Sequence, residues 1–219
     1  MSFVSFVLTQ LPSLNAIVDV EVAARAGWAP LDLAAAFLRG GARFLQLRAK
    51  TMPGDAFLAT ASALVQLAHR HDARVVINDR ADIARLADAD GVHVGQEDLP
   101  PAAVRTIVGD NASVGLSTHT TGQVEQAVLQ PVTYVAIGPV FGTATKATGY
   151  EQIGLDMVRA AARRASAHGL PLVAIGGITL ENAASVLDAG AASVAVISDL
   201  LATGDPEARV RAYVERLWR

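Results

Sequence analysis

A single (β/α)8 barrel is the fold that the sequence predicts, and three observations favour it. Eight short apolar runs, rich in β-branched residues, recur along the 219 residues. Alanine-rich stretches with helical spacing separate these runs. Strands that alternate with helices form a parallel sheet with right-handed crossovers, and eight such units in about 200 residues are typical of a closed barrel. An open doubly wound sheet is the alternative fold.

The predicted strands are short. In chain order they are Leu14 to Val20, Ala42 to Arg48, Arg74 to Asn78, Asp90 to Val94, Ala112 to Ser117, Thr133 to Gly138, Leu172 to Gly177 and Ser193 to Ser198. Helices are predicted between them, among others over 31–41, 54–71 and 120–130. The interval from Val76 to Val92 leaves room for a helix of only about two turns. We expect one domain over 1–219, with residues 1–13 as an irregular extension.

Composition and charge favour a cytoplasmic protein that acts on small molecules. Hydrophobic residues make up 52% of the chain and charged residues 18%, which is enough to fill a sizeable core. A net charge of −3 gives no basic surface for nucleic acid. The chain has no cysteine, so disulfides and thiolate metal sites are excluded. No apolar run reaches the roughly 18 residues of a membrane span. Because no Lys or Arg precedes Arg25, an export signal is not expected either.

The carboxyl ends of the strands are where a barrel carries its chemistry, so the residues there are the candidates for a site. Gln46, Arg48 and Lys50 stand at alternate positions in "QLRAK". Residues two apart in an extended segment point to the same side. One amide and two cations on one side suit a planar polar ring and an anion. The alternative is an ordinary solvated strand end.

Two aspartates follow neighbouring strands. Asn78 and Asp79 follow the third strand, and Asp98 ends "GQED" after the fourth. Magnesium prefers carboxylate and phosphate oxygens and commonly uses only one or two protein carboxylates. We therefore expect Asp79 and Asp98 to hold Mg²⁺, and the metal to hold a diphosphate. Helix capping is the alternative for both: Asp79 would cap "ADIARLA", and Asp98 would cap the helix that begins at "PPAAVRTI".

The ends of the last four strands offer groups that suit phosphate. Ser117 and His119 follow the fifth strand, where either a ligand contact or a structural role is open. The stretch from Gly138 to Gly154 is a long loop with hydroxyls, backbone N–H groups and one lysine, and long loops in compact domains are usually functional or disordered. "IGGIT" and "ISDL" end the seventh and eighth strands, where many barrels bind a phosphate.

These segments, in this order, resemble the thiamine-phosphate synthase family of barrel enzymes. The resemblance runs from Leu14 to about Leu200 and is carried by "QLRAK", "VINDRADIA", "ADGVHVGQEDLP", "GLSTHT", "GPVFGTATK", "AIGGIT" and "VAVISDL". It implies an enzyme that joins 4-amino-2-methyl-5-(diphosphooxymethyl)pyrimidine to a thiazole phosphate with the help of Mg²⁺. The products would be thiamine phosphate and diphosphate.

The resemblance also implies a role for each matching residue. Gln46 and Ser117 would contact the pyrimidine; Arg48, Lys50, Asn78 and Lys146 would hold its diphosphate; Asp79 and Asp98 would ligate magnesium; Thr143 and Thr145 would meet the thiazole; and Gly177, with the backbone near Ile197 and Ser198, would cradle the thiazole's phosphate. Lys146, Arg48 and Ser117 would act in the catalytic step. No protein nucleophile is required, so positioning and electrostatics would supply the catalysis.

Three positions depart from the family pattern. Ala49 stands where an acidic residue is frequent, Gly142 where proline is frequent, and Asn15 where an aromatic residue is frequent. Two other functions stay open: a thiazole tautomerase from the same superfamily, and a barrel that binds phosphorylated ligands without turnover. The residues that would bind diphosphate and metal argue against the tautomerase; they are Arg48, Lys50, Asp79, Asp98 and Lys146. The exposed helices of a barrel also leave room for a homodimer.

Overall fold

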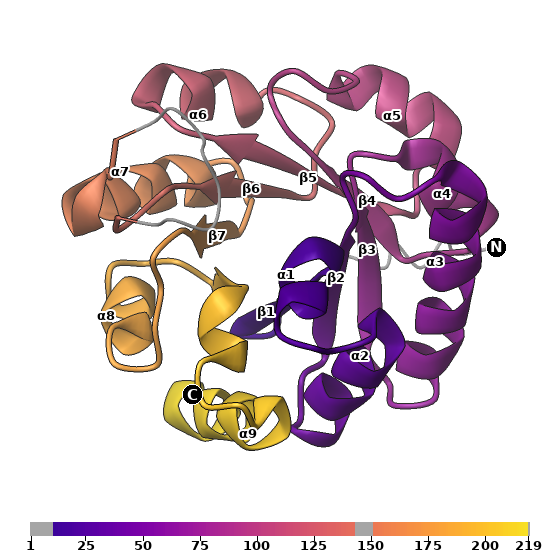
Figure 1. The fold of residues 1–219 in the computed structure, drawn as a ribbon. Helices are drawn as coiled ribbons and strands as arrows, with labels where there is room; N and C mark the ends of the chain where they lie inside the picture. The colour runs from indigo at the N-terminus through magenta and orange to yellow at the C-terminus, as the bar shows by residue number, and fades with distance from the viewer. Residues whose placement is uncertain (1–10, 143–150, 219) are drawn as a thin grey trace, which may run out of the picture.

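Eight parallel strands close into a barrel in the computed structural model, which describes residues 11–142 and 151–218 (Figure 1). Each strand is hydrogen-bonded to the next one along the chain, and the eighth pairs with the first. The strands are β1 Leu14–Asp19, β2 Phe44–Arg48, β3 Arg74–Asn78, β4 Gly91–Val94, β5 Ser113–Thr118, β6 Tyr134–Ile137, β7 Leu172–Ile175 and β8 Ser193–Val196. The predicted barrel is confirmed, and the open sheet is not formed.

Helices surround this barrel, as Figure 1 shows. They are α1 Val20–Arg25, α2 Pro30–Arg39, α3 Gly54–His69, α4 Ala81–Leu86, α5 Pro101–Val108, α6 Thr121–Ala127, α7 Gly154–Ser166, α8 Ala183–Asp188, the 3₁₀ helix η1 Ser198–Leu201 and α9 Pro206–Leu217. The three intervals predicted as helical hold α2, α3 and α6. The short interval after β3 holds α4, a helix of 6 residues.

The predicted first strand extends too far, because a helix cap ends it. Val20 begins α1, and the Asp19 carboxylate accepts a hydrogen bond from the Val22 N–H at 2.9 Å. An aspartate that precedes a helix stabilises the helix start in this way. The seventh strand also ends earlier than predicted, at Ile175, because Gly176 and Gly177 have φ angles of +100° and +64° that extended chain does not adopt. The eighth ends at Val196, two residues before η1 begins.

The hydrophobic core has two parts, one on each side of the sheet. Side chains alternate along a strand, so Ala16 and Val18 pack against the helices while Ile17 points into the barrel. The buried residues of the interior cluster are Leu11, Ile17, Phe44, Val76, Tyr134, Ala136, Val173, Ala195 and Ile197. These packed side chains fill the interior of the barrel. A ligand that enters from the carboxyl ends of the strands can therefore bind only above them.

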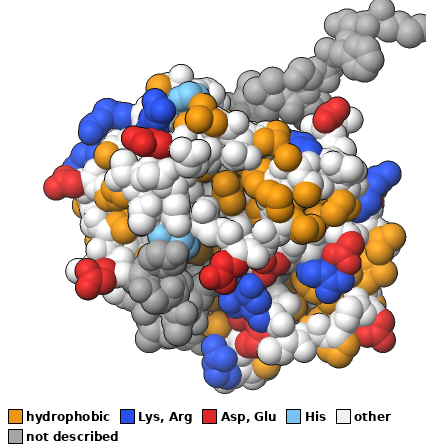
Figure 2. Space-filling model, turned by 90° about the horizontal axis from the view of Figure 1, so that it is seen from above, with side chains coloured by type: hydrophobic (Ala, Val, Ile, Leu, Met, Phe, Trp, Pro, Cys, Tyr) orange, Lys and Arg blue, Asp and Glu red, His pale blue; other side chains and the backbone are white. Residues whose placement is uncertain are grey.

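The described chain begins at the opposite, amino end of the barrel. Residues 11–13 precede β1 there, and the rest of the predicted extension over 1–13 lies outside the described residues. None of the helices in the described ranges is long and apolar enough to cross a membrane. On the face drawn in Figure 2, acidic and basic side chains are interspersed, and hydrophobic ones gather to one side. The cytoplasmic location and the homodimer stay predictions.

Candidate active site at the barrel mouth

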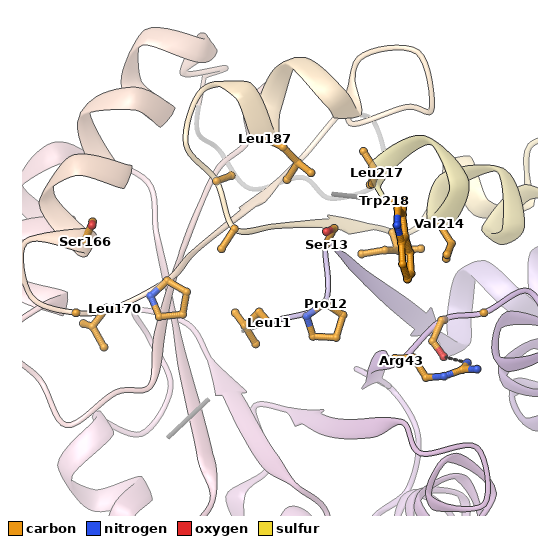
Figure 3. A pocket seen from close by; sticks show the side chains of 17 residues that line it. Leu11, Pro12, Ser13, Arg43, Ser166, Leu170, Leu187, Val214, Leu217 and Trp218 are labelled. Carbon is orange, nitrogen blue, oxygen red and sulfur yellow. Dashed lines mark hydrogen bonds between the residues drawn. The ribbon is translucent and has the colours of Figure 1, made fainter. Parts of the chain in front are cut away.

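One cavity lies at the amino ends of the strands, the end of a barrel that serves stability rather than catalysis. It measures about 790 Å³ and is lined by residues around the amino ends of the strands. Figure 3 shows Leu11 and Pro12 in the opening, with Trp218 beside them. Arg43 is its one ionisable lining residue in the described ranges, and its guanidinium already donates to the carbonyls of Leu38 and Ala42, at 3.3 and 2.9 Å. The described lining of this cavity therefore offers no carboxylate, histidine or lysine for catalysis.

The second cavity, of about 650 Å³, opens at the carboxyl ends of the strands and is rich in polar groups. The predicted site residues that line it are Gln46, Ser117, Gly177, Ile197 and Ser198. His93, His119 and Asn15 line it as well. We call it the mouth cavity. Its position is the one that active sites occupy in barrel enzymes.

Five further predicted residues lie at the ends of β2, β3 and β4 but do not line the mouth cavity. They are Arg48, Lys50, Asn78, Asp79 and Asp98. Thr143, Thr145 and Lys146 lie outside the described residues. The structure therefore places ten of the predicted positions at one end of the barrel, five on the cavity and five on the rim beside it.

A hydrogen-bonded chain of side chains forms the buried polar part of the mouth. His93 lies with Nε2 2.8 Å from Ser117 Oγ and Nδ1 3.0 Å from the Tyr134 hydroxyl. The His93 and Tyr134 rings are stacked with centroids 5.5 Å apart. Burial raises the pKa of Tyr134 well above its usual value, so its hydroxyl stays protonated. These hydrogen bonds between Tyr134, His93 and Ser117 fix the Ser117 hydroxyl at the cavity wall.

His93 belongs to β4 and also lines the cavity. It is only 8% exposed. His119 has a structural contact as well: its Nδ1 lies 2.6 Å from the Gly138 carbonyl, which joins the ends of β5 and β6. Gln46 is buried at 3% exposure, so the alternative of a solvated strand end is wrong for this residue.

Asp79 and Asp98 come together at the rim. The Asp79 N–H donates to the His93 carbonyl at 2.7 Å, which holds the end of β3 against β4. Asp98 turns back to accept from the Gly95 N–H at 2.7 Å. Burial raises the pKa of Asp79, and the nearby Asp98 carboxylate acts in the same direction, whereas an ion pair with Lys50 opposes both.

The capping alternatives for these two aspartates are wrong. Arg80 is the residue that precedes α4, and Pro100 is the one that precedes α5; neither helix start has a side-chain cap. Asp79 adopts a φ of +65°, whereas a residue that caps a helix start typically has an extended backbone. Both carboxylates are therefore available to the rim rather than to the helices.

Arg48 and Lys50 already have carboxylate partners. The parallel register places Asp19 of β1 opposite Arg48 of β2, and the two side chains form an ion pair. Asp19 accepts from Nη1 alone, and the buried Nε has no acceptor among the described residues. Because a guanidinium has five N–H groups, Arg48 keeps donors for a ligand beside its bond to Asp19. Lys50 pairs with Asp79 and keeps its side chain 49% exposed.

The β7 and β8 ends supply backbone donors. Gly177 has a φ of +64°, and a Cβ there would lie 2.6 Å from the Gly142 carbonyl oxygen, so only glycine fits without displacement. Phe141 donates its N–H to the Gly176 carbonyl at 3.0 Å, which joins this turn to the loop after β6. η1 begins at Ser198, which is itself one of the predicted phosphate contacts.

The rim chemistry fits magnesium better than a metal with nitrogen or sulfur ligands. In the described part of the chain, no three His, Cys, Asp or Glu side chains gather as a metal cage. Two adjoining carboxylates are what Mg²⁺ commonly takes from a protein, and water and substrate phosphate complete its shell. Burial, and after it the Asp98 carboxylate, raise the Asp79 pKa, and a cation bound between the two carboxylates would oppose both effects.

Together, the fold and this cavity define a (β/α)8-barrel enzyme with its polar groups at the carboxyl ends of the strands. Comparison with known proteins makes the class specific. A family model described as thiamine monophosphate synthase matches residues 15–200. The chain belongs to this family, and the predicted enzyme class, a transferase, is confirmed with it.

Individual relatives agree over nearly the whole chain. A thiamine-phosphate synthase of Roseiflexus castenholzii is 45% identical over 185 residues, which cover 84% of this chain and 80% of the relative. One from Koribacter versatilis is 43% identical over 210 residues, covering 95% and 97%. A solved thiamine phosphate pyrophosphorylase from Pyrococcus furiosus has a TM-score of 0.83 and 29% identity, covering 95% of this chain and 98% of that one.

Sequence reasoning missed four residues of the mouth. Asp19 was not expected there, although a polar residue at the end of a buried strand is the signal that marked Asp79. Tyr134 and Asp199 gave no signal, because a single tyrosine in an apolar run and an aspartate in the first turn of a helix are both common. Arg25 lines the cavity from α1, a helix that was not predicted.

Proposed function

We propose that this chain condenses 4-amino-2-methyl-5-(diphosphooxymethyl)pyrimidine with a thiazole phosphate, giving thiamine phosphate and diphosphate. The observation that carries the proposal is the pairing of Asp79 and Asp98 at the rim of a polar mouth cavity. A tautomerase acting on the thiazole alone has no need of two adjoining carboxylates beside cations. The names of the relatives support the same reaction.

Departure of diphosphate is the difficult step, and the rim is where it would be assisted. The carbon–oxygen bond to the pyrimidine methylene breaks, and the electron pair leaves with the diphosphate. Asp79 and Asp98 would hold Mg²⁺, which neutralises the charge on the departing group when bound. Arg48 would donate from guanidinium N–H groups that Asp19 does not use, and Lys50, half-exposed beside Asp79, would reach the same oxygens.

The pyrimidine would lie in the buried part of the mouth cavity. Gln46 presents an amide for the ring and its amino group, and Ser117 presents a hydroxyl that His93 holds in place. The aminopyrimidine donates electron density to the methylene cation that remains. The side chains around it are fixed by packing and hydrogen bonds, so the groups need little reorganisation as charge develops.

The thiazole would enter from the β7 and β8 side. Gly177, Ile197 and Ser198 line that wall of the cavity and would bind the phosphate through backbone N–H groups. The thiazole nitrogen then forms the new carbon–nitrogen bond with the methylene carbon. Holding both reactants in one cavity turns capture of the cation into an effectively unimolecular step. Thr143 and Thr145 are proposed to meet the thiazole on this side, and Lys146 is proposed to hold the diphosphate.

The decisive experiment is product formation by the purified protein from both precursors, with Mg²⁺ or with a chelator. We expect thiamine phosphate and diphosphate in equal amounts with the metal and almost none with the chelator. Isomerisation of a thiazole phosphate precursor that ignores the chelator would identify a tautomerase instead. Tight binding of both precursors without product would identify a non-catalytic barrel.

A further inference from the structure

Arg25 is a cation on the mouth cavity to which no role has been assigned. It is the last residue of α1, its side chain is exposed, and it lines the cavity together with Ser198 and Gly177. Among the described residues that line this cavity, it is the one lysine or arginine. Its guanidinium has no hydrogen bond or ion pair within the described ranges. Such a group is free to bind an anion.

The fold explains why Arg25 faces the cavity. Val22 packs against the barrel interior, and Arg25 follows three residues later, on the same face of the helix. β1 and β8 are paired neighbours, with Ala16 opposite Val196. The segments that leave these two strands, α1 and η1, consequently both line the cavity. Arg25 thus lies on the wall where a phosphate would meet the backbone of β7 and β8.

The other charged group on this wall does not compete for Arg25. Asp199 is the one carboxylate among the described residues that line the cavity. It accepts from Arg209 Nη2 at 2.8 Å, from the Tyr213 hydroxyl at 2.6 Å and from the Leu180 N–H at 3.1 Å. Because Arg209 neutralises it, Asp199 neither holds Arg25 nor repels an anion. The net charge of this wall is therefore the charge of Arg25.

We propose that Arg25 binds the phosphate of the thiazole substrate and makes the site prefer a phosphorylated thiazole over its free alcohol. This inference rests on the proposed function. Backbone N–H groups supply hydrogen bonds without a net charge, whereas a guanidinium supplies charge-assisted, bidentate contacts to phosphate. Only a substrate that carries the phosphate gains from Arg25.

The test compares two substrates in variants of one residue. With saturating pyrimidine diphosphate, Arg25→Ala is expected to raise KM for the thiazole phosphate roughly 10- to 100-fold, the range for a hydrogen-bonded charge pair. KM for the corresponding thiazole alcohol and for the pyrimidine diphosphate is expected to change by less than about twofold, because neither interaction involves this charge. Arg25→Lys is expected to restore part of the affinity for the phosphate.

A matched control excludes a purely structural effect. Arg25 also lies in the last turn of its helix, where a cation is favourable to the helix dipole. Arg85 occupies the last turn of α4, another helix of 6 residues, and does not line the mouth cavity. Arg85→Ala is expected to leave both KM values unchanged. Equal losses for the phosphate and the alcohol in Arg25→Ala, or no loss at all, would overturn the proposal.

Calorimetry separates this proposal from the proposed function. If the wild-type protein forms no thiamine phosphate, the synthase assignment fails, yet binding of the thiazole phosphate is still measurable. Weaker binding to Arg25→Ala, and not to Arg85→Ala, would then support the Arg25 contact alone. Equal binding of the thiazole phosphate to the wild type, Arg25→Ala and Arg85→Ala would refute the Arg25 contact.

Discussion

The hydroxyl of Tyr134 offers a sharp test of the buried chain at the mouth. Tyr134→Phe keeps the ring that stacks on His93 and that meets Phe44 edge-on at 6.1 Å, and it removes only the oxygen 3.0 Å from His93 Nδ1. A buried polar group that loses its partner costs about 1–3 kcal/mol. In a domain of 150–250 residues, each kcal/mol lowers Tm by about 2–4 °C.

Urea unfolding followed by circular dichroism measures this loss, and a double-mutant cycle with His93→Leu isolates the contact. Because burial raises the Tyr134 pKa, the folded state keeps the phenol proton while the unfolded state loses it above roughly pH 10. The advantage of the wild type over Tyr134→Phe is therefore expected to be constant near neutrality and to shrink above that pH. A variant as stable as the wild type, or the same loss in the His93→Leu background, would refute this reasoning.

Three other substitutions test the packing and charges around the site. Gly115→Ala would place a Cβ 2.1 Å from the buried ring of Tyr134, so thermal unfolding should show a loss of about 1–3 kcal/mol or more in the free energy of unfolding. An unchanged Tm would contradict the packing. Asp98→Asn removes a charge beside Asp79, so the protein should be more stable at neutral pH but nearly inactive, as unfolding and turnover measured together would show. Tyr213→Phe removes the donor to Asp199 at 2.6 Å and should cost about 1.5–3 kcal/mol in urea unfolding, whereas a neutral result would show that the bond contributes nothing.

The fold could be predicted because its signals are local. Eight apolar runs and the helices between them are visible in a single sequence, and parallel connectivity then leaves few topologies. The boundaries were less certain where two signals compete. Val20 continues an apolar run and was predicted as strand, yet the Asp19 cap starts a helix there. The hydrogen bond from the Asp19 cap favours a helix start more strongly than the β-branched side chain of Val20 favours strand.

The site could be predicted only to the level of which strand ends supply it. Asp79 and Asp98 were placed from their positions after two neighbouring strands. That Arg48 meets Asp19 depends on the register of β1 against β2, and that His93 meets Tyr134 depends on contacts inside the closed barrel. Neither of these two contacts can be predicted from the spacing of the residues along the chain.

The central claim is that Asp79 and Asp98 bind the magnesium on which diphosphate departure depends. The most direct measurement is the rate of diphosphate release as a function of Mg²⁺ concentration in the wild type, Asp79→Asn and Asp98→Asn. We expect each variant to need much more Mg²⁺ and to release diphosphate orders of magnitude more slowly, with its folded spectrum retained. Wild-type rates and an unchanged Mg²⁺ requirement in either variant would contradict the account.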